Sequence, residues 1–78
     1  IIMKFVLEYK KGKIYNVKKS DGSTSKWDRS TYVLEWLDND GKTITFWSWT
    51  GNDAPDRMTR KLQQIKASIP DMVLEHKV

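Results

Sequence analysis

The segment "YVLEWLDNDGKTITFWSW", residues 32–49, decides the fold, because it reads as two β-strands joined by a tight turn. Aromatic and β-branched residues dominate both flanks, as in strands. Between them, Asn39 and Asp40 suit the centre of a type I turn, and Gly41 suits the left-handed residue that follows such a turn. The sequence therefore predicts an antiparallel hairpin.

The length of this turn decides which side chains share a face. With a three-residue loop, Leu34 lies opposite Phe46 in an apolar core face, and Trp47 and Trp49 lie on the other face beside Thr45. A two-residue turn would instead place both tryptophans in the core face and leave Phe46 outside it. We favour the three-residue loop, because it suits the turn residues and buries Phe46 with partners.

The first thirty residues predict a second hairpin and a polar connection. Residues 2–9 have one clearly apolar face at every second position, formed by Met3, Phe5, Leu7 and Tyr9, which is typical of a strand. A loop closed by Gly12 would return the chain into another strand, with Leu7 opposite Tyr15. Residues 18–30 are rich in Ser, Thr, Asp and Gly and read as a loop, with Trp27 as their only large apolar residue.

The second half of the chain predicts a helix followed by a short strand. Asp53 is a candidate N-cap, and Pro70 prevents the helix from continuing. An apolar stripe at helical spacing faces one side: Met58, Leu62, Ile65 and Ile69. The apolar tail after Pro70 suits a short last strand. The fold class is α+β in a single domain, residues 1–78: two antiparallel β-hairpins form a small sheet or half-barrel, and one C-terminal helix packs on it.

The composition argues against several function classes. The chain has no cysteine and one histidine, so it offers neither a disulfide framework nor a thiolate metal site, and we expect no metal, cofactor or catalytic activity. No apolar run reaches the roughly 18 residues that a membrane span needs, so we expect no membrane anchor or signal peptide and an intracellular location, in the cytoplasm, nucleoid or nucleus.

Charge is concentrated near the amino terminus. Residues 1–30 contain eight Lys or Arg against three acidic residues, which favours a polyanionic partner. The candidate nucleic-acid-binding residues are the basic and aromatic side chains of the polar connection and of the aromatic strand: Lys18, Lys19, Lys26, Trp27, Arg29, Thr45, Trp47 and Trp49. The competing interpretations are that the charge serves solubility, that Trp27 covers the core, and that the first hairpin covers Trp47 and Trp49.

Two families share short motifs with this chain. The hairpin resembles that of the AP2-like amino-terminal DNA-binding domains of transposon and phage integrases, through Tyr32, Asp38, Gly41, Ser48 and Trp49. In that family a three-stranded sheet lies in the major groove, so the resemblance implies DNA binding through the sheet.

The order of elements is also similar to that of the small seven-kilodalton chromatin proteins of thermoacidophilic archaea. The shared features are "KF" near the start, Trp27, the "DNDGKT" turn and "DAP" before the helix. Both resemblances favour a nucleic-acid-binding domain, with DNA expected over RNA. The alternative is a protein-interaction or dimerisation module in which the tryptophans act as anchors.

Overall fold

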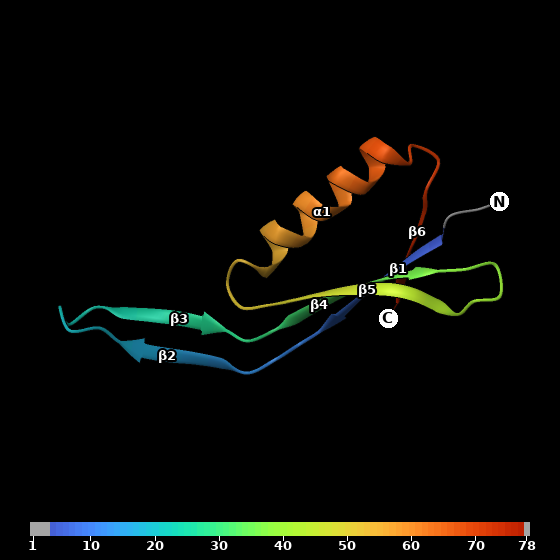
Figure 1. The fold of residues 1–78 in the computed structure, drawn as a ribbon. Helices are drawn as coiled ribbons and strands as arrows, with labels where there is room; N and C mark the ends of the chain where they lie inside the picture. Colours follow the sequence, from blue (N-terminus) through green and yellow to red (C-terminus); the bar gives the residue numbers. More distant parts are fainter. Residues whose placement is uncertain (1–3, 78) are drawn as a thin grey trace.

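A computed structural model describes residues 4–77, which form six strands and one helix (Figure 1). In chain order, these are β1 Lys4–Lys10, β2 Ile14–Lys18, β3 Thr24–Asp28, β4 Thr31–Leu37, β5 Thr43–Thr50, α1 Ala54–Ser68 and β6 Val73–Lys77. The predicted α+β class, the C-terminal helix and the short last strand are confirmed.

The strands form two separate sheets. The larger one has the order β5-β4-β1-β6, in which β4 is antiparallel to both neighbours and β6 runs parallel to β1. Helix α1 covers one face of this sheet, and we call the sheet and the helix together the body (Figure 1). Strands β2 and β3 form a two-stranded ribbon, which with its flanking residues, 11–29, we call the arm. The arm extends away from the body, and the molecule is 55 Å long but only 23 Å by 17 Å across.

The predicted pairing of the first two strands is wrong. Strand β1 pairs with β4, so that Leu7 lies opposite Leu34, while Tyr15 of β2 lies opposite Trp27 of β3. Burial explains the difference, because a central position in the body sheet encloses the apolar face of β1, whereas a lone hairpin could not. Gly12 does not close a turn: it packs so tightly against the Arg29 carbonyl that a Cβ there would overlap it.

The polar connection predicted over residues 18–30 instead contains β3 and a tight turn. The Lys19 N–H donates to the Ser23 carbonyl at 2.8 Å, and the Gly22 N–H donates to the Lys19 carbonyl at 3.1 Å. Gly22 has a φ of 89°, the left-handed conformation that glycine adopts without strain. This turn has the same form as the one predicted at Asn39, Asp40 and Gly41.

The second hairpin has the predicted turn but not the predicted faces. The Gly41 N–H donates to the Asp38 carbonyl at 3.1 Å, and Leu37 pairs with Thr43 as expected. Ile44 then forms a β-bulge, since the next pair is Trp36 with Thr45. One extra residue exchanges the two faces of a strand.

Beyond the bulge, the core pairing predicted between Leu34 and Phe46 is wrong. Leu34 lies opposite Trp47, and Phe46 lies opposite Glu35 on the uncovered face with 63% of its surface exposed. This register places Trp47 and Trp49 on the helix side of the sheet, where both pack against the core.

The core lies between the sheet and α1. Its buried residues are Phe5, Leu7, Leu34 and Ile65. The ring of Trp36 stacks on that of Phe5 with centroids 5.6 Å apart. The predicted helix stripe is confirmed, because Met58, Leu62, Ile65 and Ile69 all belong to this cluster. Asp53 occupies the N-cap position, but its side chain pairs with Arg57 at 2.8 Å instead of capping a backbone N–H.

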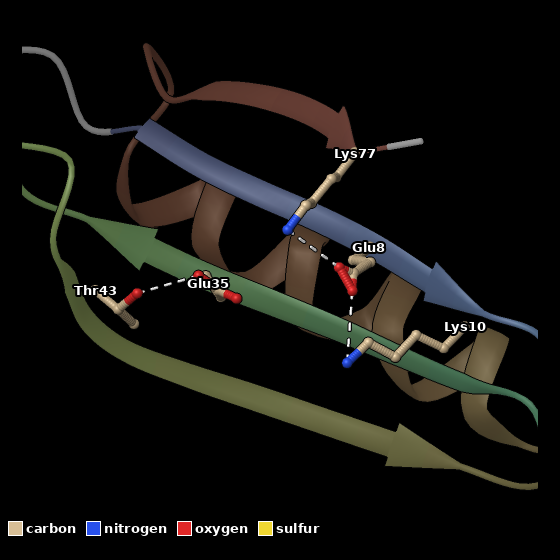
Figure 2. Close-up of polar contacts among 5 residues, drawn as sticks. All are labelled: Glu8, Lys10, Glu35, Thr43 and Lys77. Carbon is tan, nitrogen blue, oxygen red and sulfur yellow. Dashed lines mark hydrogen bonds and ion pairs between the residues drawn. The ribbon is translucent and has the colours of Figure 1, made fainter.

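The uncovered face of the sheet carries balanced charges (Figure 2). The Glu8 carboxylate lies 3.5 Å from the Nζ atoms of both Lys10 and Lys77, and the Thr43 hydroxyl donates to Glu35 at 3.1 Å. Between residues 4 and 77, no helix has both the length and the apolar character required to cross a membrane.

Candidate nucleic-acid interface

The arm is exposed on both of its faces. Every residue of β2 is exposed, and in β3 only Ser25 and Asp28 are partly covered. The cross-strand pair of Tyr15 and Trp27 leaves 49% and 51% of those side chains accessible. The interpretation that Trp27 covers the core is therefore wrong.

The arm brings together five of the predicted binding residues. Lys18 ends β2, Lys19 opens the turn, Lys26 and Trp27 lie in β3, and Arg29 follows that strand. Strand alternation puts Lys18 and Lys26 on one face of the ribbon and Trp27 on the other. One face thus carries Lys18 and Lys26, with Asp28 at its base, while the other offers the aromatic pair.

The net charge of the chain lies in the arm. Residues 11–29 contain six Lys or Arg against two Asp, whereas the remaining residues contain eight of each sign, so the arm accounts for the whole net charge of +4. The sequence count over residues 1–30 assigned this charge to the correct part of the chain. It left Lys11 and Lys13, at the base of the arm, out of the candidate set.

A polar junction holds the arm against the body. The Asn52 side chain accepts a hydrogen bond from the Asp28 N–H at 2.7 Å and donates one to the Lys26 carbonyl at 2.8 Å. The buried Ser30 hydroxyl accepts hydrogen bonds from the Tyr9 hydroxyl at 3.1 Å and from the Gly12 N–H at 3.0 Å. These bonds connect the base of the arm to the end of β1, to the residue before β4 and to the turn before α1.

Asp28 adds a charged group to this junction. Hydrogen bonds from the Ser30 side chain and from its backbone N–H lower the pKa of the Asp28 carboxyl, and the nearby positive charges of Lys26 and Lys11 lower it further. The carboxylate is therefore ionised at neutral pH. Beside it, an open pocket of about 340 Å³ is lined by Trp27, Asp28, Arg29 and residues 51–53.

The other three predicted residues lie on β5, apart from the arm. Thr45, Trp47 and Trp49 are half-buried on the helix side of the sheet. Trp47 and Trp49 line an open groove of about 430 Å³ between β5 and α1, whose other lining residues are Arg57, Arg60, Lys61 and Gln64. The predicted hairpin of the first two strands does not form, so it cannot cover these tryptophans; they pack instead on the helix side, against the core that includes Phe5 and Leu7 of β1.

Sequence reasoning missed the cations of this groove. Arg57, Arg60 and Lys61 lie outside the predicted apolar stripe and were not among the candidate binding residues. Their spacing of three and four residues puts them on one helix face, and the Nζ of Lys61 lies 4.6 Å from the centroid of the Trp47 ring. The detectable signal was a basic helix face that directly follows an aromatic strand.

The comparisons with known proteins return no match, whether to family models, to curated proteins or to solved structures. Within residues 4–77, no three His, Cys, Asp or Glu side chains lie together in a way that could hold a metal ion.

Proposed function

We propose that this protein binds nucleic acid, with DNA favoured over RNA, and that the arm is the principal contact. The observation that carries the proposal is the exposed ribbon, which holds the whole net positive charge of the chain together with an accessible Trp27. Lysine and arginine side chains that neutralise phosphates release counterions, which drives association with a polyanion.

The shape of the arm supports DNA as the ligand. A two-stranded ribbon fits the major groove of B-DNA, whereas the major groove of A-form RNA is deep and narrow. In this arrangement Lys18, Lys19, Lys26 and Arg29 contact phosphates. Trp27 contributes stacking or a wedge between bases.

The uncovered face of the body sheet is a weaker candidate for the DNA contact. The resemblance to AP2-like integrase domains implies docking through a sheet, but here that face pairs its lysines with glutamates, including Lys4 with Glu75 at 3.1 Å. Such pairs leave little net charge for phosphates. The charge distribution therefore favours the arm.

A matched pair of variants tests the proposal. Trp27→Ala and Ile44→Ala each remove an exposed apolar side chain from a strand, with exposures of 51% and 57%, but only the first lies on the arm. With a fluorescein-labelled DNA duplex and anisotropy as the readout, we expect Trp27→Ala to weaken binding roughly tenfold and Ile44→Ala less than about twofold. Absence of wild-type binding at low salt, or equal losses in both variants, would contradict the proposal.

Strand β5 supports self-association as a second candidate function. This strand forms one edge of the sheet, and its eight residues, "TITFWSWT", include no charge, proline or glycine. The opposite edge, β6, carries Glu75 and Lys77. Native sheets protect their edges with charges, so an uncharged edge with an exposed Phe46 suits pairing with a second copy of the chain. Sedimentation at increasing protein concentration would reveal such a dimer, and it should not depend on salt as DNA binding does.

A further inference from the structure

The groove between β5 and α1, defined by Trp47, Trp49, Arg57, Arg60, Lys61 and Gln64, has an aromatic floor and a basic wall. None of the residues that line it is acidic. Asp53 lies next to it and pairs with Arg57 at 2.8 Å. Among the ion pairs of residues 4–77, none involves Arg60 or Lys61, so their charges are available to an anion.

We infer that this groove binds an unpaired segment of nucleic acid, with Arg60 and Lys61 contacting phosphates and Trp49 stacking on a base. The inference rests on the proposed function and specifies the class of ligand at a second surface. Single-strand binding proteins combine a positively charged groove with aromatic side chains in the same way, because the face of every base can stack on an aromatic ring.

The need for an accessible base face argues for an unpaired strand. Stacking on an indole requires that the face of a base is free of its neighbours. In a duplex only the base edges are accessible in the grooves, so a duplex cannot offer base faces to this floor.

The two indoles have different roles. Lys61 lies over the Trp47 ring with its Nζ 4.6 Å from the centroid, which covers that face and fixes a positive charge in the groove. Trp49 lies nearer the start of α1, and no cation of residues 4–77 stacks on its ring. Trp49 is therefore the stacking platform, and Trp47 is the floor that positions Lys61.

The test compares a 12-nucleotide oligothymidine strand with a 12-base-pair duplex. The variant Arg60→Glu/Lys61→Glu reverses the groove charges at one exposed and one half-buried position of the helix, and Lys42→Glu/Lys66→Glu makes the same change of net charge at exposed positions outside the groove. Thermal melts establish that both variants fold. We expect the groove substitutions to weaken oligothymidine binding at least about tenfold more than the control substitutions do. The two variants should bind the duplex with the same affinity.

A second readout is the indole N–H signal of Trp49 in NMR spectra, which should shift when oligothymidine is added to the wild-type protein. Equal oligothymidine affinities of the groove and control variants, or an unshifted Trp49 signal, would overturn the inference while duplex binding through the arm still stands. If the wild-type protein binds neither probe at low salt, the proposed function fails and the inference fails with it.

Discussion

The backbone N–H of Asp28 in β3 donates a hydrogen bond of 2.7 Å to the side-chain Oδ1 of Asn52, in the turn that precedes α1. The Nδ2 of the same side chain donates to the Lys26 carbonyl at 2.8 Å. Asn52 lies 24 residues from Asp28 in the sequence, so one amide side chain connects the arm to the start of the helix. The direction of the arm therefore depends on a residue that belongs to the body.

The first prediction concerns Asn52→Ala, which removes both hydrogen bonds. Each such bond contributes about 0.5–1.5 kcal/mol, so we expect hydrogen exchange of the backbone amides of residues 24–28 to accelerate roughly tenfold. The amide of Leu34, in the core, is the internal control and should exchange as in the wild type. Uniform acceleration in arm and core would show that Asn52 stabilises the whole domain instead.

The second prediction concerns the close approach of Gly12 to the Arg29 carbonyl. Gly12→Ala adds a Cβ that overlaps backbone atoms, so we expect the free energy of unfolding to fall by about 1–3 kcal/mol. Gly22→Asn, in the arm turn, is the control, because its Cβ would meet no atom within 4 Å and asparagine tolerates a positive φ. Denaturant titrations of both variants measure the difference, and a smaller loss for Gly12→Ala would be inconsistent with the packing described.

The third prediction concerns the pH dependence of the junction. Folding lowers the pKa of Asp28 below its ordinary value of 3.8. The stabilisation of the folded state by the Asp28 carboxylate is therefore complete above that pH and is lost as the pH falls through the lowered folded-state pKa. We expect amide exchange in the arm, corrected for its intrinsic pH dependence, to show constant protection from pH 7 to 5 and weaker protection only below about 3.8.

The matched control for this prediction is Asp28→Asn, which cannot titrate at this position. It should show less loss of protection on acidification than the wild type. Loss of protection that begins near pH 6, or that is equal in both proteins, would exclude Asp28 as the titrating group.

The fourth prediction tests the register of the second hairpin. Phe46 is exposed whereas Trp47 packs on the core, so Phe46→Ala should change stability by less than about 0.5 kcal/mol, and Trp47→Ala should cost at least about 2 kcal/mol. Without the bulge at Ile44, the order of the two losses would be reversed. Thermal or denaturant unfolding of the two variants distinguishes the registers.

The sequence predicted the elements better than their partners. The apolar stripe and the two flanking residues, Asp53 and Pro70, predicted α1 correctly, because helical periodicity depends on residues that are close together in the sequence. The turn at Gly41 was also predicted correctly, because its residue types are typical of such a turn. Strand β1, however, pairs with β4 and β6, which are distant in the sequence, and no local pattern specifies such partners.

Tertiary packing overrode one local pattern, the faces of β5, and a second local pattern, the Asp21-Gly22 turn, was overlooked. The bulge at Ile44 exchanges the faces of β5, so that Trp47 and Trp49 pack under the helix. This burial of apolar surface depends on the position of α1, which the sequence of the hairpin alone does not specify. The Asp21-Gly22 pair was a readable hairpin signal inside the apparent loop. Recognising it would have revealed the arm, and with it the exposure of Trp27.

The most direct test of the central claim, that the arm contacts nucleic acid, is the salt dependence of duplex binding. Each phosphate contact contributes a slope of about −0.9 to a plot of log association constant against log salt concentration. We predict that Lys18→Ala/Lys26→Ala reduces the magnitude of this slope by nearly 2, whereas Lys42→Ala/Lys66→Ala leaves it unchanged. Identical slopes for the wild type and the arm variant would contradict the claim.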